Sequence, residues 1–317
     1  MKTWDNKRYF SLNTFLRQRF GDKVFKISLD AGFTCPNRDG KVSKGGCIFC
    51  SPRGSGDFAG SCGDLVQQFE EVKEMMQKKW KKGKYIAYFQ AYTNTYGDIN
   101  TLREKYYSVL QLEDVVGIAI ATRPDCLGED VLDLLEEISK EKYLWVELGL
   151  QTIHEKTAEI INRGYALETY IKAVQDLKKR NIEVVTHVIL GLPGESKEEM
   201  LQTIDFVANT GTQGIKLHLL HLMKDTPLME LYHQGQLQIM ELEEYTTLIA
   251  DCIERIPEEM VIHRITGDGP RDTLIEPRWS LKKWEVINAI EHELMDRSTW
   301  QGKKYVRNME LWERFNK

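Results

Sequence analysis

Three cysteines are the residues of this sequence with the clearest capacity for chemistry. Cys35, Cys47 and Cys50 form a C-x11-C-x2-C array in a chain of 317 residues. Thiolates separated by two residues can face one metal centre, and three glycines between Cys35 and Cys47 allow the connecting loop to fold back. Structural zinc sites and electron-transfer clusters are normally closed by four protein ligands. Three cysteines leave one coordination position open, which is typical of a site that does chemistry.

The other cysteines leave a structural alternative open. Cys62 extends the array formally to four thiolates, which would suit a zinc site in a non-enzymatic binding module. Zinc ribbons usually carry two close cysteine pairs, however, and Cys62 has no near partner. Cys126 and Cys252 stand alone in the sequence. We therefore predict that Cys35, Cys47 and Cys50 are metal ligands and that these other three cysteines are not.

Strand and helix patterns alternate along the part of the chain that must position this array. Short runs rich in β-branched and aromatic residues predict strands at 24–30, 84–90, 115–122, 143–151, 182–190 and 213–221. Helical periodicity predicts helices near 64–81, 101–111, 128–140, 168–180 and 197–209. Such alternation indicates an α/β fold with a parallel sheet, either partly closed as a barrel or open and doubly wound. Both architectures bind ligands at the carboxyl ends of the strands.

The pattern changes after about residue 222. Two further helices are predicted at 241–255 and 280–296, around a turn-rich stretch. We therefore predict a first unit over residues 1–222 and a mainly helical extension over 223–317 that packs on it and takes part in substrate binding. Within the first unit, Ser196 followed by Glu199 predicts a capping box at the start of the fifth helix.

Composition and charge narrow the class of protein. Hydrophobic residues make up 42% of the chain and charged residues 29%, as in ordinary globular proteins. No apolar run is long enough to span a bilayer, and the first residues lack the apolar core of a signal peptide, so we expect a cytoplasmic protein without a membrane partner. Residues 1–60 carry a net charge of +6 although the whole chain carries −5. This basic segment fits a polyanion such as nucleic acid, or simply a solvated face.

Several of these motifs together resemble the radical S-adenosylmethionine (SAM) superfamily. The run Cys47-Ile48-Phe49-Cys50 after the first strand is similar to the end of that family's cysteine array. Most members have three residues in the first gap, whereas the eleven here resemble the Elongator-subunit-3-like branch. Stretches at later strand ends resemble that branch and the coproporphyrinogen-dehydrogenase-like branch; they lie at 121–125, 147–151, 162–165 and 187–195. The tail segments 263–270 and 277–280 resemble the YhcC/YtqA-like group.

The resemblance implies a fold, two cofactors and a set of site residues. The fold would be a partial (β/α)6 TIM-like barrel, and Cys35, Cys47 and Cys50 would hold three irons of a [4Fe–4S] cluster whose fourth iron binds SAM. Phe49 would lie against the adenine, Glu147 and Gln151 would contact the methionyl or ribose portion, and Arg163 would pair with the carboxylate. Thr93, Asn94 and Thr95 occupy the turn that binds the SAM amine, although the family's Gly-Gly-Glu form is absent.

Each of these residues also fits a simpler structural role. Arg163 suits the carboxyl end of a helix, Glu147 suits a paired carboxylate in a barrel, and Phe49 suits a packing residue. Their order at successive strand ends favours the functional interpretation. At His187 some relatives carry an acid that contacts the ribose, so the resemblance implies no role for this histidine.

The implied activity is cleavage of SAM to a 5′-deoxyadenosyl radical that abstracts hydrogen from an unreactive carbon. The YhcC/YtqA-like resemblance implies a tRNA substrate, with conversion of a wobble-uridine carboxymethylaminomethyl group to aminomethyl. It also implies a flavodoxin- or ferredoxin-type electron donor. Phosphate-binding cations would come from the basic first segment and from Arg264, Arg271, Arg278, Lys282 and Lys283. A small-molecule substrate such as a porphyrin precursor is the enzymatic alternative.

Overall fold

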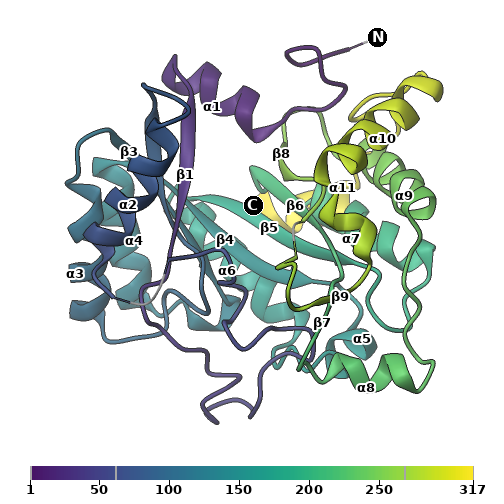
Figure 1. The fold of residues 1–317 in the computed structure, drawn as a ribbon, viewed down its shortest axis with the longest axis horizontal. Helices are drawn as coiled ribbons and strands as arrows, with labels where there is room; N and C mark the ends of the chain where they lie inside the picture. The colour runs from purple at the N-terminus through teal and green to yellow at the C-terminus, as the bar shows by residue number, and fades with distance from the viewer. Residues whose placement is uncertain (1, 61–62, 268, 317) are drawn as a thin grey trace.

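Seven strands run parallel in one curled sheet (Figure 1). The computed structural model describes residues 2–60, 63–267 and 269–316, so Cys62 lies outside the described residues. Adjacent strands pair in the order β1 (Val24–Leu29), β2 (Lys84–Phe89), β3 (Val115–Thr122), β4 (Tyr143–Gln151), β5 (Glu183–Leu190), β6 (Gly214–Leu219) and β8 (Val261–Arg264). The sheet forms an open half-barrel of the expected TIM-like type, which confirms the predicted fold class.

Helices cover the outer face of this sheet (Figure 1). The crossover helices are α2 (Leu65–Gln77), α3 (Ile99–Leu110), α4 (Glu129–Glu141), α6 (Leu167–Lys179), α7 (Lys197–Ala208) and α9 (Leu242–Arg255). Shorter or terminal helices are α1 (Leu12–Phe20), α5 (Glu155–Ile160), α8 (Leu228–His233), α10 (Lys283–Asp296) and α11 (Met309–Asn316). The small strands β7 (Leu222–Met223) and β9 (Leu274–Glu276) form an antiparallel pair.

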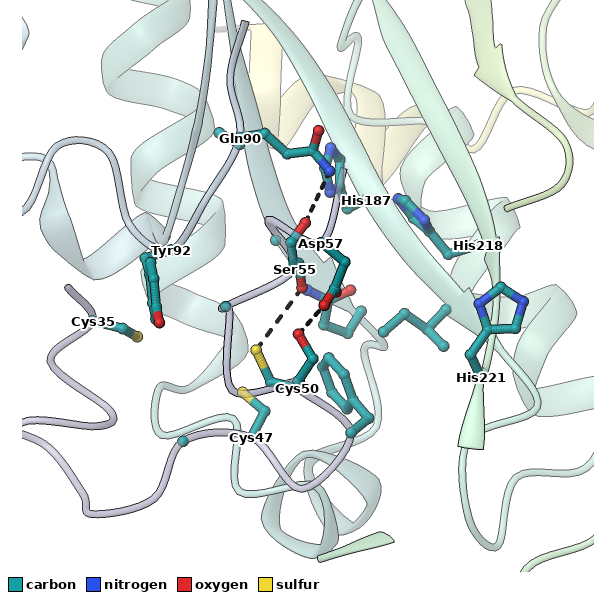
Figure 2. A pocket seen from close by; sticks show the side chains of 18 of the residues that line it. Cys35, Cys47, Cys50, Ser55, Asp57, Gln90, Tyr92, His187, His218 and His221 are labelled. Carbon is teal, nitrogen blue, oxygen red and sulfur yellow. Dashed lines mark hydrogen bonds between the residues drawn. The ribbon is translucent and has the colours of Figure 1, made fainter. Parts of the chain in front are cut away.

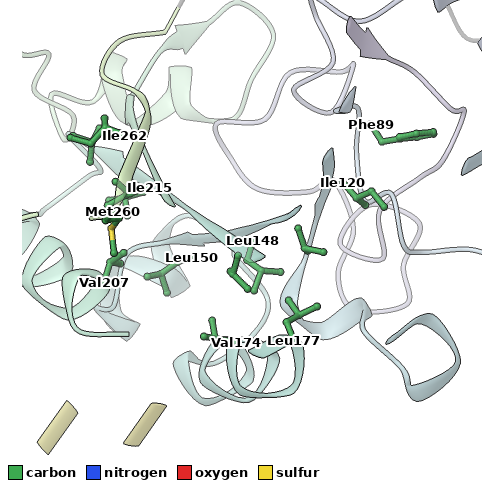
Figure 3. Packing of buried hydrophobic residues seen from close by; sticks show 14 of the residues in the cluster. Phe89, Ile120, Leu148, Leu150, Val174, Leu177, Val207, Ile215, Met260 and Ile262 are labelled. Atoms are coloured by element: carbon green, nitrogen blue, oxygen red, sulfur yellow. The ribbon is translucent and has the colours of Figure 1, made fainter. Parts of the chain in front are cut away.

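The main core lies between the sheet and these helices. Figure 3 shows Leu148 and Leu150 of β4 near Val174 and Leu177 of α6, and all four side chains are buried. Fully burying such a side chain contributes about 1.5–3 kcal/mol. The amphipathic pattern of the helices therefore fixes which face each one turns toward the sheet.

A second apolar cluster fills the amino end of the barrel interior. Ile86, Trp145 and Val185 belong to it, and Leu16 of α1 packs against them from outside the sheet. Ser11, which caps α1, forms a β-bridge with Ile262 at the same end of the barrel. This cluster occupies the amino-end part of the interior, where a second pocket is also lined by Val185 and His263, and the pocket lined by the cysteines opens at the carboxyl ends.

The six predicted strands correspond to β1–β6, and the structure adds a seventh. Strand β8 comes from the tail that was predicted to be mainly helical, and it pairs with β6. It has only four residues, so it is too short to show a clear strand pattern. The unit boundary at residue 222 stays a prediction. No helix within the described ranges is both long and apolar enough to cross a membrane.

The predicted capping box at the start of α7 is confirmed. The Ser196 hydroxyl accepts a hydrogen bond from the Glu199 amide at 3.2 Å, and the Glu199 carboxylate accepts one from the Ser196 amide at 2.8 Å. We expect Ser196→Ala to lower the free energy of unfolding by about 1 kcal/mol, because the Glu199 amide loses its acceptor.

A matched serine inside a helix provides the control for this substitution. Ser139 donates to the Glu136 carbonyl of its own helix, so Ser139→Ala should leave stability nearly unchanged. Urea unfolding of both variants measures the difference. Equal losses in the two variants would contradict a specific capping role for Ser196.

Candidate active site

A pocket opens at the carboxyl ends of the parallel strands. Its walls come from the loop after β1, from the ends of β2–β6, and from the tail residues Arg264, Gly269 and Pro270. Figure 2 shows the three cysteines on one side of this pocket and His187 and His218 on another. The loop that follows β1 and the strand ends therefore meet where a parallel barrel normally binds its ligands.

The loop that carries the cysteines is held from two directions. Arg38 donates to the carbonyls of Cys50 and Ser51 at 3.0 and 2.5 Å, which fixes the segment after the last cysteine. Asn162, in the segment between α5 and α6, donates to the Gly46 carbonyl at 2.8 Å. Gly46 itself has a φ of +86°, and a Cβ there would lie 2.9 Å from Arg38. Glycine is required at this position for both conformation and space.

Asn37 connects the cysteine loop to the same segment. Its side-chain nitrogen donates to the Asn162 carbonyl at 2.6 Å and lies 3.6 Å from the Cys47 sulfur. The backbone amide of Ile48 also donates to the Ile161 carbonyl at 3.1 Å. These contacts position Cys47 and Cys50 relative to the end of β4.

The three thiols fit a cluster better than a single ion. Cys35, Cys47 and Cys50 all line the pocket, yet no three His, Cys, Asp or Glu side chains in the described part of the chain converge closely enough to bind one metal ion. Thiolates of a [4Fe–4S] cluster bind different irons and need not converge on one point. A three-cysteine set spread along one wall therefore matches a cluster with one open iron.

Burial controls the protonation of these thiols. Burial, followed by the proximity of Cys50, raises the pKa of Cys47 to about 12, although Arg123 opposes the change. Burial also raises the pKa of Cys50, against the opposing charge of Arg38. Iron supplies the positive charge that favours thiolates, so binding of a cluster would release protons from this wall of the pocket.

The turn after β2 is only partly directed at the pocket. Thr93 lines it, whereas Asn94 and Thr95 are buried behind it. Asn94 donates through its side chain to the carbonyls of Phe89 and Ala121, and Thr95 lies 2.5 Å from the Thr122 hydroxyl. These two residues hold the turn in place, and the proposed contact of the turn with the SAM amine stays a prediction.

Gln151 and Arg163 both line the pocket at the end of β4. A register shift between Gly149 and Gln151 and a φ of +69° at Gln151 bend the strand there. Arg163 is 1% exposed and donates from one nitrogen to the carbonyls of Leu150 and Thr152, at 3.1 and 2.6 Å. Its Nε donates to the Tyr165 carbonyl at 3.0 Å and its other terminal nitrogen pairs with Glu155 at 3.3 Å, so the guanidinium organises the strand end at the pocket wall.

Phe49 has two environments. Its ring lines the pocket, and it also packs against the apolar cluster that contains Ile161, Ile189 and Leu220. The packing role and the proposed contact with adenine are therefore compatible at this position.

Glu147 lies fully buried at the floor of the pocket, where its carboxylate is surrounded by donors. Trp145 Nε1 and His187 Nε2 lie 2.9 Å from its oxygens, and Lys216 forms an ion pair with it. Burial opposes ionisation, yet Lys216 and then Lys26 lower the pKa of Glu147 well below its usual range. Burial and then Lys216 lower the pKa of His187 to about 4, so a neutral His187 donates its Nε2 proton to the carboxylate.

Sequence reasoning did not single out several residues of this floor. Lys26 and Lys216 point into the barrel from β1 and β6, and a charged residue within an apolar strand was the available signal. Arg264, predicted to contact phosphate from the tail, instead lines the pocket at the end of β8. The seventh strand brings this residue to the barrel, and a phosphate contact by Arg264 stays a prediction.

Family models decide the classification of this fold and site. The model described as the radical SAM superfamily matches residues 35–207, which begins at Cys35 and covers more than half of the chain. The protein belongs to the radical SAM superfamily. The Radical_SAM C-terminal domain matches residues 212–296.

Individual relatives agree with this membership. The uncharacterised protein YtqA of Bacillus subtilis is 55% identical over 95% of this chain and 94% of its own length. The tRNA uridine(34) acetyltransferase of Methanocaldococcus jannaschii is 28% identical over 51% of this chain and 30% of its own length. The solved structure of Methanocaldococcus infernus Elp3 has a TM-score of 0.66 at 16% identity, covering 88% of this chain and 64% of that chain, which shows a shared fold.

Family membership determines the type of chemistry. Radical SAM proteins are enzymes that use a [4Fe–4S] cluster and SAM, so these are the cofactors of this chain. The donor set agrees, because three thiols and a strand end with Gln151 and Arg163 share one pocket. The assignment of individual ligands remains our proposal.

We propose that Cys35, Cys47 and Cys50 are the cluster ligands. After anaerobic reconstitution, alanine at any of the three should greatly reduce iron content and abolish SAM cleavage, because each would bind a separate iron. Cys126→Ala is the matched control, because Cys126 is half-buried and close to Asp125 and Arg123 but does not line the pocket. Full iron content in Cys35→Ala, or its loss in Cys126→Ala, would refute the assignment.

We also propose that Arg163 contributes to SAM binding. Arg163→Ala should weaken SAM binding by roughly 10-fold or more and retain the cluster, because a buried guanidinium pairs strongly with a carboxylate. Arg180→Ala removes an arginine that pairs with Glu129 at the outer surface and should leave the affinity unchanged. If Arg163→Ala lowers the melting temperature but binds SAM as tightly as wild type, its role is purely structural.

Proposed function

We propose that this radical SAM enzyme modifies the wobble uridine of tRNA, converting a carboxymethylaminomethyl group to aminomethyl. The observation that carries the proposal is the similarity, over half of the chain, to a tRNA uridine(34) acetyltransferase. The resemblance of the tail segments to the YhcC/YtqA-like group supports the same substrate. The acetyltransferase is much longer than the shared region, so the reaction proposed here belongs to the radical SAM portion alone.

The position of the pocket suits a base that is flipped out of the RNA stack. Proteins that act on a single base usually take it out of the stack and bind it in a pocket. Gly269 and Pro270 line the pocket, and the next residue, Arg271, is exposed. Lys282 is also exposed, although it pairs with Glu285. These cations lie on the tail that borders the pocket, where they are available to phosphate groups.

The proposed reaction requires hydrogen abstraction from the glycyl methylene of the modified uridine. When bound, the cluster and SAM supply a 5′-deoxyadenosyl radical for this step. The resulting carbon radical would lose one electron to a one-electron acceptor such as the oxidised cluster, and water would hydrolyse the imine so formed. The C–N bond would then break, which releases glyoxylate and leaves the aminomethyl group.

Cys35, Cys47 and Cys50 would hold the cluster, and Gln151 and Arg163 would orient SAM. The buried barrel floor would hold the target group away from bulk water. A flavodoxin- or ferredoxin-type donor would supply the electron.

The direct test follows the nucleoside. Reduced enzyme with SAM and tRNA carrying carboxymethylaminomethyl-uridine should produce aminomethyl-uridine in proportion to 5′-deoxyadenosine, measured after digestion of the RNA. Binding of the tRNA should weaken steeply as salt rises, because phosphate contacts release counterions. Charge reversal at Lys282 and Lys283 should weaken binding of most tRNAs alike.

Two results distinguish the radical SAM activity from the proposed tRNA substrate. Cys47→Ala should form neither product, which provides the negative control. If wild-type enzyme cleaves SAM but leaves the nucleosides unchanged, the tRNA proposal fails and membership of the radical SAM superfamily stands. A failure to retain tRNA at low salt would favour a small-molecule substrate instead.

A further inference from the structure

Positive charge gathers at the floor of the pocket. Lys26 enters the barrel from β1, Lys216 from β6 and Arg264 from β8. Lys216 and Arg264 are register neighbours on paired strands. Lys26 Nζ lies 3.7 Å from a Glu147 oxygen, and Lys216 binds the other oxygen of that carboxylate. Two lysines therefore pair with one buried carboxylate, and Arg264 lies beside Lys216 on the neighbouring strand.

This positive charge is only partly neutralised within the described residues. Glu147 and Asp57 are the acids that line the pocket there, and Asp57 accepts from Ser51 in the cysteine loop at 2.8 Å. No described carboxylate lies within ion-pair distance of Arg264. With both lysines protonated and His187 neutral, the group of Lys26, Lys216, Arg264 and Glu147 has a formal net charge of +2. Burial lowers the pKa of Lys216 well below its usual range, and a bound anion would oppose this effect.

Like charges held together out of water are costly unless an anion joins them. Burial lowers the pKa of Lys26, and Arg264 adds to this effect against the opposing influence of Glu147. Tyr88 lies beside both lysines, and its hydroxyl accepts a hydrogen bond from Lys216 Nζ at 3.1 Å. The floor therefore combines excess positive charge with a neutral hydroxyl, and an anionic group that enters the pocket would balance this charge.

The cysteine thiolates that would hold the iron–sulfur cluster do not neutralise this positive charge. The thiols lie on a different side of the pocket from His187 and His218 (Figure 2). His187 contacts the same carboxylate as Lys216. RNA backbone phosphates do not account for it either, because Lys216 is 3% exposed and belongs to a strand inside the barrel. An anionic group can reach Lys216 only by entering the pocket.

We propose that Arg264, with Lys216, binds a carboxylate group of the substrate at the floor of the barrel, where both line the pocket, and that Lys26 acts only through its ion pair with Glu147. This proposal rests on the proposed function, since a carboxymethylaminomethyl group ends in a carboxylate next to the methylene that would lose hydrogen. Arg264 makes the direct contact, because its planar guanidinium can donate two parallel hydrogen bonds to a carboxylate. Glu147 is a positioning residue that holds the two lysines in place.

Two anticodon stem–loops test this specificity. One carries carboxymethylaminomethyl-uridine and the other carries the same group with a carboxamide in place of the carboxylate. Wild-type holoenzyme should prefer the carboxylate in kcat/KM and in RNA affinity. Arg264→Gln should lower kcat/KM for the carboxylate by roughly 10- to 100-fold and leave the carboxamide nearly unchanged. Arg264→Lys should retain part of the preference.

Arg264 is the suitable position for this test because its removal leaves no described buried acid without its partner. Iron content and SAM affinity of Arg264→Gln should match wild type. This result would show that Arg264 binds the carboxylate of the substrate and not the carboxylate of SAM. Affinity for an unmodified stem–loop should also be unchanged, which would show that Arg264 does not bind an RNA phosphate. Arg103→Gln, which removes an exposed arginine paired with Glu137 on the outer helices, should behave as wild type in every assay.

The outcomes distinguish this proposal from the proposed function. Conversion of both stem–loops with equal kcat/KM would overturn the carboxylate site and leave tRNA modification intact. Weakened SAM binding in Arg264→Gln with unchanged substrate preference would assign Arg264 to the cofactor and overturn the proposal. If wild-type enzyme converts neither stem–loop while it cleaves SAM, the proposed function fails and the carboxylate site fails with it.

Discussion

The buried carboxylate of Glu147 is the interaction on which the interior of the barrel depends. It accepts from Trp145 and His187 and pairs with Lys216, so it connects side chains of β4, β5 and β6. A carboxylate with no exposed surface is stable only when charge and hydrogen bonds compensate for the loss of water. Loss of Glu147 would leave the buried Lys216 and the partly buried Lys26 without a counter-charge, whereas loss of one lysine would still leave the carboxylate three donors.

This arrangement divides the interior into layers along the barrel axis. Apolar side chains around Trp145 and Val185 fill the amino end beneath α1. Charged and imidazole side chains form the middle layer, and the cysteine loop borders the carboxyl end. Glu147 and Lys216 of the middle layer are buried, so electrostatic interactions there are stronger than they would be at the surface. A polar substrate group can bind there only if its charge matches.

The cysteine loop is coupled to the barrel by a small set of polar contacts. Asn37 and Asn162 connect it to the segment between α5 and α6, and Arg163 ties the end of that segment to the end of β4. Cluster ligands and the proposed SAM residues therefore share one network. A change in this segment would alter both sites, which is why iron content and SAM affinity must be measured separately.

The sequence alone determined the local features of this protein. Strand and helix positions follow from the spacing of apolar residues, the cap at Ser196 follows from a local motif, and the grouping of Cys35, Cys47 and Cys50 follows from their proximity in the chain. The radical SAM fold class could be predicted because these signals occur in a fixed order. Each depends on residues that are close in sequence, so no knowledge of distant contacts was needed.

Only the tertiary structure decided which polar side chains face the pocket. Asn94 and Thr95 turn behind it, whereas their neighbour Thr93 lines it. Arg264 enters the barrel because β8 pairs with β6 across a separation of more than forty residues, and Lys26 reaches Glu147 from the opposite end of the strand order. Closure of the sheet brings these charges together, and their burial then determines their protonation. Neither effect has a signature in local sequence, since both depend on which strands pair and how far the sheet curls.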